Sequence, residues 1–462
     1  MRFLIPFVTT EKPTIDRFSG WAFKLAGPIG AAIYLCMSTS LLASEMPHNE
    51  LTLRRTVELS LQSHPALASY QYRVMSANAY ALQAAIGEKP EIHLTLEDGL
   101  GTGERVGLDN SQSTLSISWV LQAGLLDQRV KSAQSKTNVL EIERDIQRYD
   151  VAAQTAHAFL TVLAYQERLG VALNAQKYAL QALKDIQKRV DAGRSPSADK
   201  LQAEVNLERR ELEVEDIQHE LKSAKKILAS QWGASSVDFV RASGALTLNE
   251  QVISYDTLEN GISNNPQVRY FLTQQRVIDT EMTLAREEAK NRWRLNAGVR
   301  RYEATEDYAL TFGVSLPLGK STRKRHKISA LSAEQARYGA DARAKEIQLS
   351  TQLYVLYEEL QHSYHLNNAL TQKILPRLER ALVETQKAYS LGKYSYREWY
   401  TLQNEVLDTR MELINVRLQA QNNLTEIERL TGLNLMVATS TTSVINNADL
   451  SAIEVKNNGN NQ

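Results

Sequence analysis

Apolar residues recur at every third or fourth position along two unusually long stretches of the chain. The first stretch, residues 125–191, contains no proline and a single glycine. Alternating spacings of four and three are typical of a helix whose apolar seam packs against another helix. At roughly 1.5 Å per residue, the 67 residues of this stretch would extend about 100 Å, so we expect a rod. The seam consists of Ile142, Ile146, Tyr149, Ala153, Ala156, Leu160 and Leu163.

The second long stretch, residues 321–391, repeats this design. Its only helix breakers are Gly339 and Pro376. We expect a kink at Pro376, because the proline ring removes a backbone hydrogen bond and crowds the preceding turn. The apolar seam here consists of Leu349, Leu353, Leu356 and Leu360. Shorter helices are expected over residues 51–87, 197–232, 256–291 and 395–433.

Four short runs instead alternate apolar and polar residues, the pattern of a β-strand. They lie near residues 91–98, 113–122, 293–301 and 308–317. Each run has about the length that a tilted strand needs to cross a bilayer. Taken alone, the alternation favours four half-buried strands of a soluble sheet. The long rods and the export signal described next reverse that preference towards a membrane barrel with a wet lumen.

The N-terminal region predicts export. An apolar stretch runs from Ala26 to Leu42, follows Lys24 and ends in the small residues Ala43 and Ser44. This pattern favours a secretory signal peptide over residues 1–44. The alternative is a single membrane anchor, which the shortness of the stretch disfavours. Two cysteines are needed for a disulfide, and this chain has only Cys36.

Landmarks spaced about 200 residues apart divide the chain into two tandem repeats. His64-Pro65 recurs as Asn265-Pro266 after 201 positions, and the turn at Gly193 recurs at Gly392 after 199 positions. A period this long implies duplication of a whole half rather than a solenoid. We assign a first repeat to residues 45–233, a linker to 234–255, a second repeat to 256–435, and a polar, partly disordered tail to 436–462.

Composition and motifs exclude several classes of function. The 53 Lys and Arg balance the 53 Asp and Glu, which argues against a nucleic-acid partner. A mean hydropathy of −0.36 argues against a helical membrane protein. His362 and His365 are close in sequence but have no third ligand nearby. Since no nucleophile, nucleotide or zinc-protease motif is present either, we expect no enzyme activity, cofactor or metal site.

A membrane location would force the chain to oligomerise. Four strands leave two edges whose backbone groups would be unpaired in lipid. Several copies must therefore pool their strands, and three copies would give 12, an even number within the range of known barrels.

The two glycine turns carry a family resemblance. The segments RVDAGRSPSADKLQAE and AYSLGKYSYREWYTLQNE resemble the TolC family of outer-membrane efflux proteins, and the likeness extends over residues 51–435. The segment LEDGLGTGERVGLDNSQSTLSIS resembles the CzcC-like heavy-metal branch. The resemblance implies a mainly α fold that forms a homotrimer. A 12-stranded membrane β-barrel would be continued by a long coiled-coil α-helical barrel in the periplasm.

The resemblance also implies gate and pore residues. The family places an acid six positions after each tip glycine, which matches Asp199 and Glu398, and a tyrosine three before the second glycine, which matches Tyr389. These residues would make closing contacts and an acidic constriction. Two positions depart from the family pattern: Thr401 replaces a second acid, and Tyr394 replaces a basic gate partner. The tips expected to contact a periplasmic adaptor are Gly193, Arg194, Gly392 and Lys393.

The sequence thus predicts the outer-membrane exit duct of a tripartite efflux system, exporting divalent heavy-metal cations. Its expected partners are a periplasmic adaptor, an inner-membrane transporter of the resistance-nodulation-division type and outer-membrane lipid. One alternative keeps the duct but changes the cargo to drugs or to proteins of type I secretion. Another is a periplasmic coiled-coil structural protein without a pore.

Overall fold

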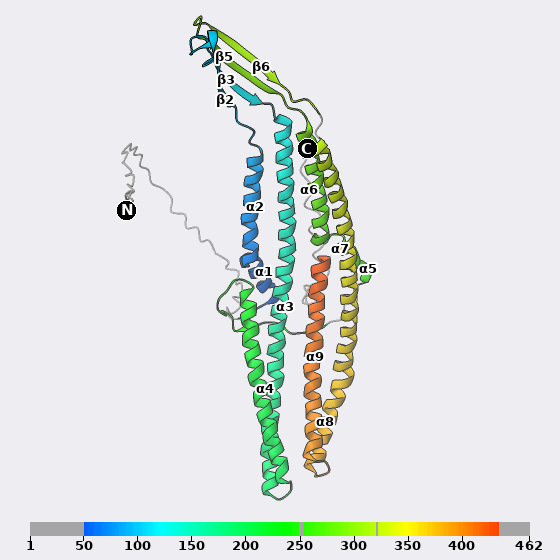
Figure 1. Ribbon diagram of the computed structural model, residues 1–462. Helices are drawn as coiled ribbons and strands as arrows, with labels where there is room; N and C mark the ends of the chain where they lie inside the picture. Colours follow the sequence, from blue (N-terminus) through cyan, green and yellow to red (C-terminus); the bar gives the residue numbers. More distant parts are fainter. Residues whose placement is uncertain (1–49, 249–253, 320–321, 434–462) are drawn as a thin grey trace, which may run out of the picture. The chain divides into compact units, whose positions relative to one another are not determined.

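A computed structural model describes residues 50–248, 254–319 and 322–433 of the chain. Two helical hairpins dominate it (Figure 1). The first consists of α3 (Ala123–Asp191) and α4 (Ser197–Ser230). The second consists of α7 (Thr322–Asn368), a π-helical segment η2 (Ala369–Ile374) and α8 (Leu375–Ser390), followed by α9 (Tyr396–Thr431). The predicted signal peptide, the tail from residue 436 and part of the predicted linker lie outside the described residues.

Each half begins with two shorter helices where the sequence predicted one, and the second helix of each pair starts at its predicted proline. They are α1 (Leu53–Ser63), α2 (Pro65–Ala84), α5 (Tyr255–Ile262) and α6 (Pro266–Ala289). Proline suits a first helical turn because its missing N–H would have no partner there. The preceding side chains cap the helices: His64 Nδ1 accepts from the Ala66 amide at 3.2 Å, and Asn265 Oδ1 from the Gln267 amide at 2.8 Å.

The four predicted strands form one antiparallel sheet in the order β2-β3-β5-β6. Their bounds are Glu91–Glu97, Gln112–Val120, Arg294–Tyr302 and Tyr308–Ser315. The register sets Ile92, Ile117, Ala297 and Phe312 side by side across the sheet, so that the apolar rows of all four strands share one face. The sheet of a single chain is open, with β2 and β6 at its edges. A separate parallel pair joins β1 (Glu50–Leu51) to β4 (Arg241–Ala242).

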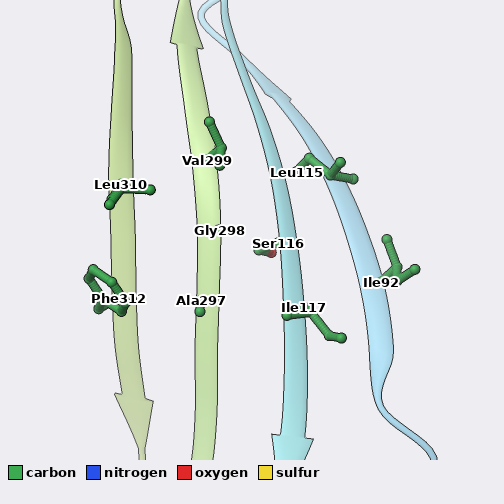
Figure 2. A pocket seen from close by; sticks show the side chains of 9 residues that line it. All are labelled: Ile92, Leu115, Ser116, Ile117, Ala297, Gly298, Val299, Leu310 and Phe312. Atoms are coloured by element: carbon green, nitrogen blue, oxygen red, sulfur yellow. The ribbon is translucent and has the colours of Figure 1, made fainter.

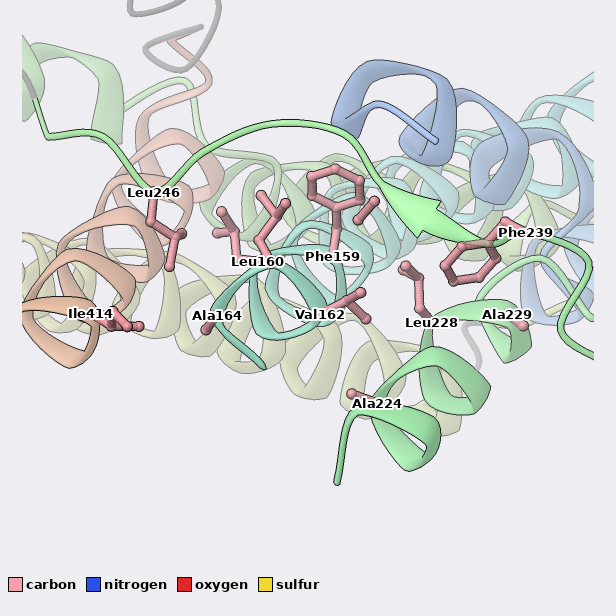
Figure 3. Packing of buried hydrophobic residues seen from close by; sticks show 12 residues of the cluster. Phe159, Leu160, Val162, Ala164, Ala224, Leu228, Ala229, Phe239, Leu246 and Ile414 are labelled. Atoms are coloured by element: carbon pink, nitrogen blue, oxygen red, sulfur yellow. The ribbon is translucent and has the colours of Figure 1, made fainter. Parts of the chain in front are cut away.

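The largest buried apolar cluster lies where the two halves meet along α3 (Figure 3). Phe159 and Leu160 of α3 pack there with Leu228 of α4 and Ile414 of α9. The connecting segment after α4 adds further apolar side chains, Phe239 and Leu246 among them. Burial of these side chains stabilises the junction at roughly 25 cal/mol per Å² of apolar area removed from water. The cluster therefore fixes the two hairpins against each other at mid-length.

The helix expected over residues 321–391 is helical without a break from Thr322 to Ser390, but one segment of it is not α-helical. The π-helical segment Ala369–Ile374 joins α7 to α8, and Pro376 lies in the first turn of α8. A π turn shifts the hydrogen-bonding partner by one residue. That shift accommodates the proline, which has no N–H to donate to the preceding turn. The π turn thus lets the helix continue past the proline.

A polar network ties α3 to α9 near the same level. The ring of His157 lies between Asn422 Oδ1, at 2.8 Å from Nδ1, and Glu426 Oε1, at 2.9 Å from Nε2. Arg429 bridges Glu426 at 2.8 Å and Asp150 at 3.2 Å. Burial by itself would lower the pKa of His157, but the bonds to Glu426 and Asn422 outweigh it and raise that pKa. The hydrogen bond to His157 lowers the pKa of Glu426, and the bond to Arg429 lowers it by a smaller amount.

These shifts predict a pH-dependent contribution to stability. A histidine whose pKa is raised on folding gives its full stabilisation of the folded state below its ordinary pKa of about 6.5. That stabilisation is lost as pH rises through the folded-state pKa. A glutamate whose pKa is lowered on folding stabilises the folded state above its ordinary pKa of about 4.3, and that stabilisation is lost as pH falls. The His157–Glu426 pair should therefore stabilise most between these two values.

We expect His157→Gln to lower the thermal unfolding midpoint more at pH 5.5 than at pH 8.5. At pH 5.5 the loss should correspond to about 1.5–3 kcal/mol, the range for a hydrogen bond to a charged group. Unfolding followed by circular dichroism at the two pH values measures both differences. An equal loss at both would show that the imidazolium does not contribute.

Candidate functional site

One face of the four-stranded sheet is covered by large apolar side chains (Figure 2). They surround a shallow hollow over the middle of the sheet. Most are well exposed in the single chain, with 79% of Phe312 and 74% of Ile92 accessible. A contiguous apolar patch on this scale marks a surface that contacts lipid or another protein. The apolar side chains among the lining residues are Ile92, Leu115, Ile117, Ala297, Val299, Leu310 and Phe312.

The opposite face carries small and polar side chains. Arg300 lies near the loop end of this face and binds across three strands: it pairs with Glu97 at 2.8 Å and donates to Thr114 Oγ1 and Gln112 Oε1, each at 2.9 Å. Gly298 allows β3 and β5 to approach here, because a Cβ at this position would lie 2.7 Å from the Leu115 carbonyl oxygen. The sheet thus has one apolar face and one polar face.

The two hairpin turns are built alike. Gly193 and Gly392 have φ angles of +69° and +71°, a left-handed conformation that favours glycine. In the first turn the Arg194 amide donates to the Arg189 carbonyl at 2.7 Å and the Gly193 amide to Val190 at 2.9 Å. The second turn repeats both bonds, from Lys393 to Ala388 and from Gly392 to Tyr389. This is the Schellman pattern, which satisfies the last carbonyls of α3 and α8.

The predicted pore acids both lie in the first turn of a helix that follows a tip. Asp199 is in the first turn of α4, and Glu398 is in the first turn of α9. Glu398 forms a capping box with Ser395: its Oε2 accepts from the Ser395 amide at 2.8 Å, while Ser395 Oγ accepts from the Glu398 amide at 3.3 Å. The hydrogen bond from the Ser395 amide lowers the pKa of Glu398 most, and the bond from the Ser395 hydroxyl lowers it further.

Tyr389 is buried among aromatic rings. Its ring stacks on Trp399 with centroids 5.2 Å apart, and Tyr396 lies 6.4 Å away. Burial raises its pKa; Arg189 works against that rise and Asp199 adds to it. No hydrogen bond joins the Tyr389 hydroxyl to Asp199 within the described part of the chain, so this expected closing contact is not made inside one protomer.

The sequence interpretation missed the residues that pack around Tyr389. Arg189 of α3 lies over the tyrosine ring, with Cζ 4.4 Å from its centroid. Trp399 and Tyr396 come from the start of α9. The aromatic run Tyr396, Trp399 and Tyr400 has helical spacing directly after the turn, which could have predicted a local cluster. Nothing in the sequence pairs Arg189 with Tyr389, which lies 200 positions away.

Neither metal-ligand clusters nor membrane-length apolar helices occur in the described residues. No three His, Cys, Asp or Glu side chains in residues 50–248, 254–319 and 322–433 gather as a cation would require. His362 and His365 are both exposed. Among the helices of these same ranges, none is both long enough and apolar enough to cross a bilayer.

Comparisons with known proteins place these features in a family context. A family model described as outer membrane efflux protein matches residues 56–234 and 264–433. The cobalt-zinc-cadmium resistance protein CzcC of Cupriavidus metallidurans is 23% identical over 385 residues, which cover 83% of this chain and 90% of that protein. The nickel and cobalt resistance protein CnrC of the same organism is 25% identical over 318 residues, covering 67% of this chain and 73% of that protein.

Solved structures show the same fold. CusC superposes with a TM-score of 0.67 at 15% identity, covering 83% of this chain and 92% of that one. The open state of the MtrE outer membrane channel of Neisseria gonorrhoeae gives a TM-score of 0.66 at 12% identity, covering 82% and 88%. At such identities the likeness establishes the arrangement of helices and strands.

The turn glycines give a prediction with an internal control. Gly193→Ala should lower stability by about 1–2 kcal/mol, because an L side chain is strained in the left-handed region. Gly170→Ala, in the middle of α3 with open space around it, should raise stability by about 0.5–1 kcal/mol. Thermal unfolding midpoints of the two variants measure both effects. A shift of the same sign in both would contradict the conformational argument.

Proposed function

Because the chain belongs to the outer membrane efflux protein family, we propose that it is the outer-membrane exit duct of a tripartite system that exports divalent heavy-metal cations. The family match to residues 56–234 and 264–433 is the observation that supports the assignment as a duct. The cargo rests on the alignment, over most of both chains, with a protein named for cobalt, zinc and cadmium resistance. Since no described cluster of side chains could select a cation, the duct would be passive, and selection and energy would come from its partners.

We propose that three chains close their sheets into a 12-stranded barrel. The open sheet has two edges, and in lipid every unpaired backbone group at an edge would cost several kcal/mol. The exposed apolar face would meet lipid, and the polar face around Arg300 would line the lumen. The helical hairpins would then extend the duct into the periplasm as an α-helical barrel, with the glycine turns at its far end.

The turns would contact a periplasmic adaptor through Gly193, Arg194, Gly392 and Lys393. Their exposed Schellman geometry supports this role. The adaptor would connect the duct to an inner-membrane transporter of the resistance-nodulation-division type. Two tandem repeats, 45–233 and 256–435, would account for the matching hairpins and turns.

Asp199, Tyr389 and Glu398 would form the constriction near these turns. Asp199 and Glu398 lie on the helices that leave the two turns. A ring of three Glu398 carboxylates in the trimer would attract cations. Its lowered pKa keeps the carboxylate charged. Thr401 and Tyr394 stand where the family resemblance expects an acid and a base. Without the acid at 401, the constriction would carry less negative charge than the family pattern gives.

Neighbouring residues on β2 test the assignment of the two faces. Leu94 lies on the apolar face and is 77% exposed, while Thr95 lies on the polar face. Leu94→Arg should sharply reduce the yield of trimer in the outer membrane, since arginine on a lipid face costs about 2–4 kcal/mol at the bilayer midplane. Thr95→Arg should leave assembly intact and reduce cation selectivity in planar bilayers. The reverse pattern would overturn the assignment.

Deletion of the gene tests the cargo. In a strain stripped of other family members, loss of this chain should sensitise cells to zinc, cobalt or cadmium by several doubling dilutions, with little change for hydrophobic drugs. Growth inhibition series measure both. Greater sensitivity to drugs would move the cargo to that class, and a secretion defect without metal sensitivity would favour type I export.

A further inference from the structure

We propose that His93, Glu91 and Ser118 form a weak binding site for divalent transition-metal cations on the polar face of the sheet. The inference rests on the proposed duct function, because that function places this face along the lumen. We call these three side chains the His93 site. A cation passing through the duct would bind there briefly without being selected.

The three side chains come from two paired strands and lie on one face. Glu91 and His93 are two positions apart on β2, so both side chains share the polar face with Thr95. The register sets Ser118 of β3 opposite Glu91. His93 Nε2 lies 3.0 Å from Ser118 Oγ and 3.4 Å from Glu91 Oε2. The imidazole nitrogen is therefore the shared neighbour of two side-chain oxygens.

These separations are the ones expected of ligands around a single ion. Bonds from zinc to histidine nitrogen or carboxylate oxygen are about 2.0–2.2 Å long. Two ligands at that distance lie about 3.0 Å apart at a right angle and about 3.4 Å apart at the tetrahedral angle. A cation could therefore bind Nε2 together with these oxygens after little movement of the side chains. Without a cation, the same atoms interact through hydrogen bonds and charge.

The donor types favour a transition-metal ion over the hard cations. Imidazole nitrogen combined with carboxylate oxygen suits zinc, cobalt, nickel and copper, whereas magnesium and calcium prefer oxygen ligands alone. A catalytic zinc site has three strong protein ligands, and no group of three His, Cys, Asp or Glu occurs among the described residues. With one imidazole, one carboxylate and a neutral hydroxyl, binding should be weak and similar for several metals.

Exposure and neighbouring charge fit a site that exchanges its ion readily. The side chains of His93 and Glu91 are 49% and 62% exposed, so an ion could reach both from the polar side. Arg294 lies further along the same face, opposite Val120, and its positive charge would weaken cation binding. The sequence did not suggest this site, because Ser118 is 25 positions from His93 and meets it only through the pairing of β2 with β3.

The test uses the full-length protein as a purified trimer, with Zn²⁺ as the probe. His219 and His362 are replaced by glutamine in every sample, because each stands three or four positions from another possible ligand on a helix. In this parent background the variants are His93→Ala, Glu91→Gln and Ser118→Ala. Isothermal titration measures the affinity and the number of zinc ions bound per chain, and circular dichroism checks that the helices are intact.

The matched control is Thr95→Ala, which changes the next polar-face position of β2 and should bind zinc like the parent. We expect one zinc ion per chain in the parent. His93→Ala should weaken binding at least about tenfold, since loss of even an outer contact to a metal ligand has an effect of that size. Glu91→Gln keeps the shape of the side chain but removes its charge, so it tests the site even if His93→Ala fails to assemble.

Magnesium and the Ser118 variant test whether coordination rather than charge holds the ion. Mg²⁺ in roughly hundredfold excess should not displace zinc, because magnesium binds imidazole poorly. Ser118→Ala should give the smallest loss of affinity, since a neutral hydroxyl is the weakest of the three ligands.

Planar bilayers test whether the site lies on the passage. Zinc should lower the cation selectivity of the parent, because a bound dication outweighs the negative charge of Glu91 on the lumen wall. His93→Ala should not respond to zinc at the same concentration.

Equal zinc affinity in His93→Ala and Thr95→Ala would overturn the inference, as would displacement of zinc by magnesium. Zinc binding that depends on His93 but leaves selectivity unchanged would show that the site lies off the passage, which would also overturn it. A parent trimer that never conducts would contradict the duct function, while the titration would still decide whether the His93 site binds metal.

Discussion

The pairing of β3 with β5 is the interaction on which the rest of the structure depends. It joins the two halves of the chain in one continuous register, from Gln112 opposite Tyr302 to Val120 opposite Arg294. Strand side chains alternate with a period of two, so a slip of one residue would send the apolar row of one half to the polar side of the other. The register therefore creates the two faces, and it starts α3 directly beside the second half.

From that junction the helices extend as paired hairpins with most of their cross-hairpin contacts concentrated in few places. The apolar cluster around Phe159 and Ile414 and the His157–Glu426 network hold the middle. Close to the turns, the aromatic cluster and Arg189 hold the ends, with a hollow between the two regions. Such an arrangement keeps the middle fixed while the turn end depends on a few groups.

Passive transport is consistent with what the sheet offers. The polar face presents serine, threonine and glycine together with charged side chains of both signs, among them Arg294 and Arg300, and Arg300 pairs with Glu97. Such a surface can line a water-filled lumen without binding cargo tightly, and release of the cargo requires weak binding. Selection of a metal would then fall to partners that the chain itself does not include. Resistance proteins with similar sequences are named for several different metals, which accords with a duct that does not select.

Local features of this protein were readable from the sequence because they depend on near neighbours. The four strands, the proline-capped starts of α2 and α6 and the left-handed glycines at 193 and 392 follow from side-chain period and backbone sterics. The length of α3 was also predicted closely. Tertiary structure alone decided the order of the strands and the placement of Arg189 against Tyr389. These depend on contacts between residues up to about 200 positions apart, and no local pattern encodes which partner a side chain will meet once the hairpins pack.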